Sequence, residues 1–343
     1  MIRQMIPHYV SLSRRSRSGA QRPSMTDLRS DPTARPGSDL STQPTPLQPP
    51  CTTRRRPLRG VWPALLTVLY AAGCADLPSP LAGGEYVAMG SSFAAGPGVG
   101  VYEEASPAPC FRSGQNYARQ LAARLGMRLR DVSCSGATTA HLTGPRDSLP
   151  PQLDALGADT RLVTVTIGGN DLGYIGRLTA GSCIGLAAET GGSAADCRPL
   201  PPVPGEDVYG ALASRMETIA REVRRRAPAA RLVFVDYLSV LPETGQCAGT
   251  PLPAGQADED RRIARRLATI TERVAAENQA DLLKASVLSL GRDACSPEPW
   301  MHGYPRPEAP VNGAPYHPTL AGMTAIADAL EGMLRSSVSR PPG

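Results

Sequence analysis

Along most of this chain, short apolar runs alternate with segments whose apolar residues recur at helical spacing. This alternation restricts the folds that the chain can adopt. The runs expected to form strands cover residues 86–89, 129–132, 162–167, 232–235 and 282–288. Apolar residues spaced three and four apart predict helices over residues 116–125, 212–223, 263–274 and 319–334. Strands that alternate with helices form a parallel sheet covered on both faces. We therefore predict an α/β fold, a three-layer sandwich around a central parallel sheet.

One segment does not follow this alternation. Residues 179–205 are dominated by Gly, Ala, Pro and Cys. We expect a long excursion pinned by a disulfide, because an unsupported loop of that length is unusual in a compact domain.

The N-terminal part differs in composition from the rest. Residues 1–53 are rich in Ser, Arg, Pro and Thr and have no sustained apolar period, so we expect a disordered leader or a start codon assigned upstream of the true one. Residues 54–74 have the layout of an export signal, with arginines, a short apolar run and small residues that end at Cys74. We expect a linker over residues 75–84, one folded domain over residues 85–335 and a tail over residues 336–343.

The export signal can be interpreted in three ways. Small residues directly before Cys74 resemble a bacterial lipobox, in which the cysteine is lipidated after cleavage, although Ala71 stands where a lipobox usually has Leu. The alternatives are simple secretion, or an uncleaved anchor or chance match. The apolar run over residues 61–70 is too short to span a bilayer as a helix. We expect a secreted or cell-envelope protein, attached to the membrane through Cys74 where the lipobox is used.

Charge and composition exclude some partners. The net charge is +5, but the first 60 residues contain 11 Arg and 3 Asp, which leaves −3 for the remaining 283 residues. Because the folded domain is not basic, nucleic acid is not an expected partner. No cluster of Cys and His has the spacing of a zinc site, so we expect no metal. We also expect no cofactor, and a monomer.

Six cysteines follow Cys74, an even number without a CxxC pair. In an exported chain this pattern favours disulfides, with free buried thiols as the alternative. Six cysteines allow 15 pairings, and the sequence does not choose between them. We predict that nearest neighbours pair, as Cys110–Cys134, Cys183–Cys197 and Cys247–Cys295.

Four short blocks stand where predicted strands end or where the last helix begins. They are Gly90-Ser91-Ser92-Phe93, Cys134-Ser135-Gly136-Ala137-Thr138, Gly168-Gly169-Asn170-Asp171 and His317-Pro318-Thr319. Open α/β sheets place their chemistry at the carboxyl ends of the strands. A serine hydroxyl is a poor nucleophile until a base takes its proton. Ser92 is the candidate nucleophile and His317 the candidate base, with His302 or a purely structural role for His317 as alternatives.

The order and content of these blocks resemble the SGNH, or GDSL, hydrolase superfamily, most of all its secreted actinobacterial esterases and lipases. The resemblance covers about residues 84–335. It implies the flavodoxin-like SGNH hydrolase fold and hydrolysis of a carboxylic ester with Ser92 as nucleophile. It also implies an oxyanion hole made of the backbone N–H groups of Ser92 and Gly136 and the side chain of Asn170. Glycine permits close approach of substrate to the backbone, and an asparagine amide offers two neutral donors.

Two positions depart from the family pattern. Ser91 stands where the family usually has Asp, and Ala314 stands where it usually has an acid three residues before the histidine. Because no side chain at Ala314 can hold the imidazole, we expect its backbone carbonyl to orient His317, or Asp293 to approach instead. A carbonyl has no full charge and stabilises an imidazolium less than a carboxylate does.

These observations predict a serine ester hydrolase, an esterase or lipase that acts on small-molecule or lipid esters through an acyl-enzyme. The second hypothesis is an esterase that removes acetyl groups from polysaccharide, because the same superfamily handles lipids and sugars. The third hypothesis is a catalytically inactive envelope protein that binds lipid or glycan, which only Ser91 and Ala314 support.

Overall fold

The computed structural model describes residues 81–336. The predicted leader, the export signal with Cys74 and most of the linker lie outside the described residues, as does all but the first residue of the tail.

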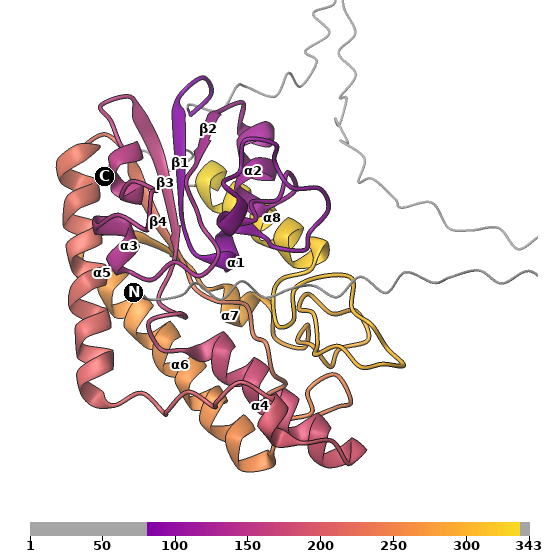
Figure 1. Ribbon diagram of the computed structural model, residues 1–343. Helices are drawn as coiled ribbons and strands as arrows, with labels where there is room; N and C mark the ends of the chain where they lie inside the picture. Colours follow the sequence, from indigo (N-terminus) through magenta and orange to yellow (C-terminus); the bar gives the residue numbers. More distant parts are fainter. Residues whose placement is uncertain (1–80, 337–343) are drawn as a thin grey trace, which may run out of the picture. The chain divides into compact units, whose positions relative to one another are not determined.

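Five parallel strands form a single sheet in the order β2-β1-β3-β4-β5 (Figure 1). They are β1 (Glu85–Gly90), β2 (Arg128–Asp131), β3 (Thr160–Thr166), β4 (Arg231–Val235) and β5 (Asp281–Leu283). Residues of β1, β3 and β4 are almost all buried, as expected for a sheet covered on both faces. The predicted parallel α/β sheet is confirmed, and β1 lies between β2 and β3.

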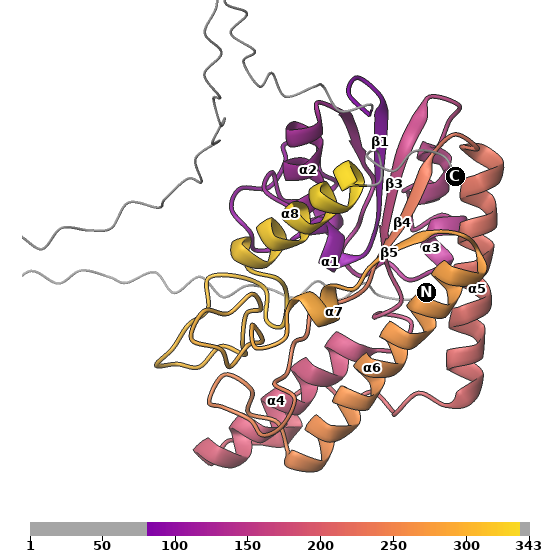
Figure 2. The ribbon, with the colours of Figure 1, turned by 180° about the vertical axis from the view of Figure 1, so that it is seen from behind.

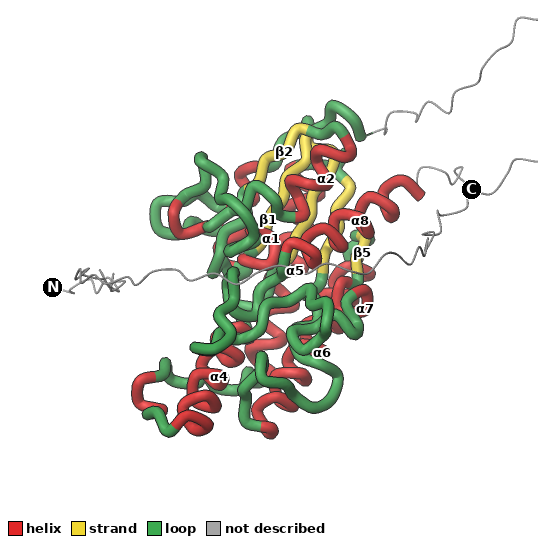
Figure 3. The backbone as a smooth tube through the Cα atoms, turned by 90° about the vertical axis from the view of Figure 1, so that its right-hand side faces the viewer, coloured by secondary structure: helices red, strands yellow, loops and turns green. Residues whose placement is uncertain are grey.

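Helices cover both faces of this sheet and complete three layers. The helices α2 (Tyr117–Leu125) and α8 (Leu320–Ser336) pack together on one face, and α5 (Glu206–Arg226) and α6 (Ala254–Glu277) pack together on the other (Figures 1 and 2). Figure 3, turned by 90° from Figure 1, looks onto the layer of α2 and α8, with the strands behind it. The strand order places β1, which precedes the predicted nucleophile, inside the sheet and next to its central strand β3.

The predicted helices form for the reasons that their sequences indicate. The side chain of Asn116 caps α2 by accepting the N–H of Arg119, and Gly126 ends it in the left-handed conformation. In α5 the apolar stripe of Leu212, Met216, Ile219 and Val223 is buried. Acidic residues in the first turn of α5 and three arginines in its last turn complement the helix dipole.

The strand predicted over residues 282–288 is wrong beyond Leu283. There β5 ends, and the short helix α7 (Ala285–Leu288) follows. The carboxylate of Asp236 accepts the backbone N–H of Ser286 at 2.8 Å and its hydroxyl at 2.6 Å, which fixes a turn at this point. Val287 is 57% exposed, so this apolar residue does not extend the buried strand.

The segment over residues 179–205 is only partly the excursion predicted. The helix α4 (Tyr174–Thr190) continues through its first part, and the irregular part begins after Thr190. Its small residues serve packing, because a Cβ at Gly185 would collide with the carbonyl oxygen of Pro251. The Cys183–Cys197 disulfide joins the helix to the irregular part, as expected.

All three disulfides join nearest neighbours, as predicted: Cys110–Cys134, Cys183–Cys197 and Cys247–Cys295. The first of them connects the loop before α2 to the loop after β2. Within residues 81–336, no helix combines the length and apolar character needed to cross a membrane.

Candidate active site

Ser92 lies in a tight turn at the carboxyl end of β1. The backbone of Gly90 has a φ of 137°, and a Cβ there would collide with the carbonyl oxygen of Thr166 on β3. Ser91 donates its backbone N–H to that same carbonyl at 2.9 Å. Ser92 then opens the short helix α1 (Ser92–Ala95) and is only 6% exposed. Glycine at position 90 thus allows the turn that brings Ser92 to the edge of the sheet.

His317 and Ser92 are neighbours in space although 225 positions separate them in the chain. The Nε2 of His317 lies 2.8 Å from the Oγ of Ser92. Its Nδ1 lies 2.8 Å from the carbonyl oxygen of Pro315. A carbonyl only accepts hydrogen bonds, so Nδ1 carries the proton and Nε2 presents its lone pair to the serine hydroxyl. This is the tautomer that a general base requires.

The carbonyl that orients this ring belongs to Pro315, so the prediction of Ala314 is wrong. The carbonyl of Ala314 accepts the backbone N–H of His317 at 3.2 Å instead. Tyr316 has a φ of 59°, in the left-handed region, and the chain turns tightly there. The turn occupies the carbonyl of Ala314 and leaves that of Pro315 for the ring. Asp293, the other predicted partner, accepts the backbone N–H of Cys295.

The surroundings of His317 favour its neutral form. Burial lowers the pKa of His317 to about 4, the hydrogen bond to Pro315 partly opposes this, and nearby His302 lowers the pKa further. Burial also lowers the pKa of His302. His302 does not contact Ser92 by a hydrogen bond; its backbone N–H donates to the carbonyl of His317 at 2.9 Å. His317 is therefore unprotonated, and able to act as a base, from mildly acidic pH upward.

Gly136, a predicted oxyanion donor, lies in the loop after β2. Its φ is 80°, within a turn closed by the bond from the N–H of Ala137 to the carbonyl of Cys134 at 3.0 Å. The N–H of Cys134 donates to the carbonyl of Gly90 at 3.0 Å. The loop that contains Gly136 is thus attached to the residue at which β1 ends.

Asn170, the other predicted donor outside Ser92, lies in the loop after β3. Its Nδ2 donates to the carbonyl of Ala137 at 2.8 Å, which leaves its second amide N–H for another acceptor. The carboxylate of Asp171 accepts the N–H of Thr139 at 3.0 Å. These bonds join the loops after β2 and β3. Because β1 lies between those strands, the two loops flank the turn that contains Ser92.

Tyr237 is a site residue that the sequence reasoning missed. Its hydroxyl lies 3.1 Å from the Oγ of Ser91 and accepts the N–H of Gly169 at 2.9 Å. Its ring centroid is 4.4 Å from that of Phe93, which in turn lies 5.5 Å from His317. Burial raises the pKa of Tyr237 to about 12, so the hydroxyl stays protonated. Tyr237 follows the predicted strand over residues 232–235 and so lies at the same edge of the sheet, and this position could have identified it from the sequence.

The described residues offer no ready place for a metal. Within residues 81–336, no three or more His, Cys, Asp or Glu side chains are grouped so that they could hold an ion. The arrangement instead has the parts of nucleophilic acyl transfer: a buried hydroxyl, a neutral imidazole oriented by a carbonyl, and two flanking loops with N–H donors.

Comparison with known proteins identifies the family. Residues 88–325, which contain all four blocks, match the GDSL-like Lipase/Acylhydrolase family. Lipase 2 of Streptomyces coelicolor is 34% identical over 260 residues, which cover 71% of this chain and 83% of that protein. The crystal structure of phospholipase A1 from Streptomyces albidoflavus NA297 is similar with a TM-score of 0.59 and 26% identity, over 73% of this chain and 99% of that one. The extracellular lipase from Streptomyces rimosus gives a TM-score of 0.58 with the same identity and coverage. The chain therefore belongs to the GDSL-like lipase/acylhydrolase family and is a carboxylic ester hydrolase of the serine type.

Proposed function

We propose that this protein hydrolyses lipid esters through an acyl-enzyme formed on Ser92. The observation that carries the proposal is the 2.8 Å contact between the buried Ser92 hydroxyl and the unprotonated Nε2 of His317. Ser92 Oγ attacks the ester carbonyl while His317 takes its proton, and the alcohol leaves with that proton. Water, deprotonated by the same nitrogen, then attacks the acyl-enzyme, and the carboxylic acid is released with Ser92 restored.

The negative charge that develops on the carbonyl oxygen needs fixed donors. We assign these to the backbone N–H groups of Ser92 and Gly136 and to the free N–H of the Asn170 side chain. The bond from Asn170 to the carbonyl of Ala137 supports this assignment, because it ties Asn170 to the loop that contains Gly136. A donor of this kind lowers the barrier by about 3 kcal/mol.

A lipid ester is the substrate class that we favour over acetylated polysaccharide. Two of the relatives with the same fold are a lipase and a phospholipase A1. Ser91, one of the two departures that suggested an inactive protein, bonds to Tyr237, and the carbonyl of Pro315 does for His317 what a side chain at Ala314 could not.

A series of p-nitrophenyl esters, from acetate to palmitate, tests the mechanism and the substrate class together. We expect wild type to hydrolyse the longer esters, and Ser92→Ala to lose at least a thousandfold in kcat. Ser214→Ala, at an exposed serine on α5, is the matched control and should behave as wild type. Equal rates for wild type and Ser92→Ala would rule out the serine mechanism. Activity confined to acetate and to acetylated xylan would favour the polysaccharide hypothesis.

We further propose that the protein is exported and acts outside the cytoplasm. Three disulfides support this, because such bonds persist in oxidising compartments. The similar lipase from Streptomyces rimosus is extracellular. Cell fractionation of a strain producing the full chain tests it, and the intact mass of the processed protein shows whether Cys74 carries lipid. Retention of the protein in the cytoplasm with free thiols would contradict export.

A further inference from the structure

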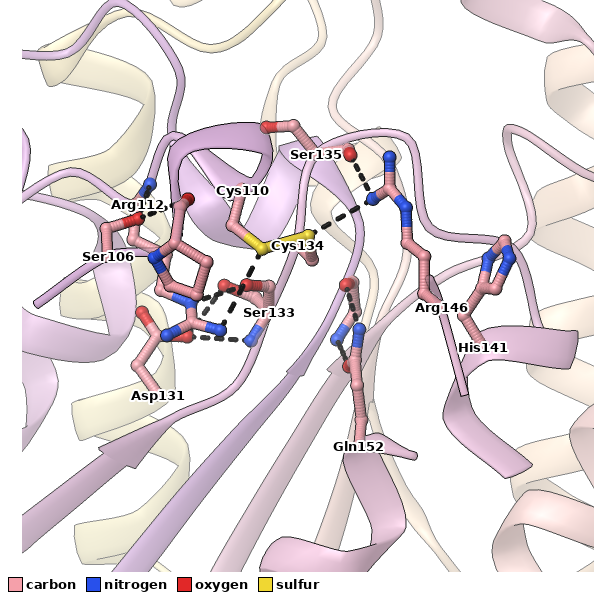
Figure 4. The surroundings of a disulfide bond; sticks show 12 residues. Ser106, Cys110, Arg112, Asp131, Ser133, Cys134, Ser135, His141, Arg146 and Gln152 are labelled. Atoms are coloured by element: carbon pink, nitrogen blue, oxygen red, sulfur yellow. Dashed lines mark hydrogen bonds between the residues drawn. A yellow bond between two sulfur atoms is a disulfide. The ribbon is translucent and has the colours of Figure 1, made fainter. Parts of the chain in front are cut away.

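A hollow of about 180 Å³ lies beside the loop that follows β2, separate from the catalytic residues. Neither Ser92 nor His317 lines it. Its apolar walls come from a valine, a leucine and three prolines, and its polar lining includes Arg112, Arg130, His141 and Arg146. Figure 4 shows Arg112 and Arg146 on either side of the Cys110–Cys134 disulfide, with His141 beyond Arg146.

The three arginines of the hollow bond only to neutral acceptors among the described residues. Nε of Arg112 donates to the carbonyl of Ser133 at 2.6 Å, and Nη1 of Arg130 donates to the carbonyl of Ala155 at 3.0 Å. Nη1 of Arg146 donates to the carbonyl of Ser135 and to the sulfur of Cys134. A guanidinium has five N–H groups, so each of these arginines keeps donors for another acceptor. Elsewhere in the fold Arg177, Arg261 and Arg266 each pair with a carboxylate.

The carboxylates near the hollow are already engaged. Asp131 accepts Nδ2 of Asn116 at 2.8 Å and the N–H and hydroxyl of Ser133 at 2.9 and 2.6 Å. Asp154, on the lining, forms an ion pair with Arg226 at 2.7 Å. The three arginines of the hollow therefore face two carboxylates, Asp131 and Asp154, and Arg226 already balances the charge of Asp154. The hollow keeps a net positive charge, with apolar walls around it.

His141 adds a ring N–H donor to this lining. Its Nδ1 accepts the backbone N–H of Thr138 at 3.0 Å. A nitrogen that accepts an N–H is unprotonated, so in the neutral ring the proton is on Nε2. The hollow then combines cationic donors with an imidazole N–H.

We propose that this hollow is a binding site for a phosphate group, with Arg112 and Arg146 as its main donors. The planar fork of a guanidinium matches the oxygens of a phosphate bidentately, and the apolar walls suit carbon substituents on that phosphate. The phosphate can come from the headgroup of a phospholipid substrate or from a free anion that acts as an effector. The headgroup source rests on the proposed lipid esterase function, whereas binding itself does not.

Arg146 connects this site to the active site. It holds the carbonyl of Ser135, and its Nη2 would lie 3.0 Å from a Cβ placed on Gly136 (Figure 4 shows the bond to Ser135). A phosphate on Arg146 therefore acts on the segment that contains the proposed oxyanion donor Gly136. Occupancy of the hollow should alter turnover as well as binding.

Calorimetric titration of inorganic phosphate into the Ser92→Ala protein, at constant ionic strength, tests the site without any need for hydrolysis. We expect saturable binding that Arg112→Gln or Arg146→Gln weakens about tenfold, the order expected for loss of a charge-assisted hydrogen bond. Arg128→Gln is the matched control, because Arg128 lies on the same strand as Arg130 but donates to the carbonyl of Gly83, outside the hollow. Its affinity should equal that of the parent.

Two results would overturn the site: no saturable binding, or equal weakening by Arg128→Gln. Thermal unfolding of each variant shows whether it is folded. Should Arg112→Gln and Arg146→Gln both unfold, Arg130→Gln replaces them, because Arg130 is exposed and its loss leaves the interior intact. With that variant, an affinity equal to that of the parent counts against the site.

Kinetics on the active enzyme distinguish the two sources of phosphate. For a headgroup, Arg112→Gln lowers kcat/KM about tenfold on a short-chain phosphatidylcholine and leaves it unchanged on the matching diacylglycerol. For a free effector, added phosphate changes the rate on a p-nitrophenyl ester in wild type, and Arg112→Gln requires about tenfold more phosphate for the same change. An enzyme without any esterase activity would contradict the proposed function and leave the phosphate titration of Ser92→Ala to decide the site by itself.

Discussion

Replacement of Tyr237 by Phe tests whether the buried hydroxyl of Tyr237 joins the turn that contains Ser92 to the loop that contains Asn170. The hydroxyl lies 2.9 Å from the nitrogen of Gly169 and 3.1 Å from the Oγ of Ser91. Phenylalanine keeps the ring and its contact with Phe93 but leaves the buried N–H of Gly169 without this acceptor. An unsatisfied buried donor costs about 1–3 kcal/mol, and loss of the bond to Ser91 costs about 1 kcal/mol. We expect the free energy of unfolding to fall by about 2–4 kcal/mol.

The same substitution should lower turnover more than substrate affinity. Gly169 directly precedes Asn170, so a loosened loop misplaces the proposed oxyanion donor, and we expect kcat to fall about tenfold or more with a smaller change in KM. Urea unfolding and p-nitrophenyl ester kinetics measure the two effects. Tyr209→Phe is the control, because the hydroxyl of that buried tyrosine on α5 makes no hydrogen bond among the described residues. A Tyr237→Phe enzyme with wild-type stability and kcat would refute the proposed role of the Tyr237 hydroxyl in holding the two segments together.

Three further predictions follow from the same structure. The acid limb of kcat/KM should have its midpoint near pH 4, because activity is lost as His317 becomes protonated and burial holds its pKa at about 4; a midpoint near the ordinary histidine value would show that the ring is well solvated. Asn170→Ala should lower kcat about 10²–10³-fold in steady-state assays with KM little changed, and a loss below threefold would remove Asn170 from the oxyanion hole. Gly185→Ala should cost about 1–3 kcal/mol in denaturant unfolding because its Cβ meets Pro251, whereas Gly210→Ala, in open space on α5, should stabilise by about 0.5–1 kcal/mol; similar effects for both would contradict the packing argument.

Much of the fold could be predicted because local signals and burial agree. The runs that became β1, β3 and β4 consist of apolar and β-branched residues and are buried on both faces, so their pattern clearly indicates strands. The prediction of the fifth strand was wrong after Leu283, where a hydrogen bond between residues far apart in the chain ends the strand. Asp236, 50 positions before Ser286, accepts its N–H and hydroxyl and fixes the turn after Leu283, and no local pattern contains that information.

The side chains of the candidate site could be predicted from the sequence, whereas the backbone group that orients His317 could not. Ser92 and His317 could be named because a serine at the end of a strand and a histidine before a helix are visible in the sequence, and the structure brings them to 2.8 Å. The orienting carbonyl could not be assigned correctly, because it depends on the left-handed conformation of Tyr316. Every residue has a carbonyl, so only the path of the turn selects Pro315 over Ala314.

The separation of Ser92 and His317 along the chain has a consequence for when the protein becomes active during its translation. His317 follows Ser92 by 225 positions, which a ribosome takes roughly 10–45 seconds to translate, and throughout that time the growing polypeptide has Ser92 but not His317. Hydrolytic competence therefore arises only after the segment before α8 has been made and His317 lies beside Ser92. Recovery of ester cleavage during refolding consequently reports the placement of this C-terminal segment, and not merely collapse of the sheet.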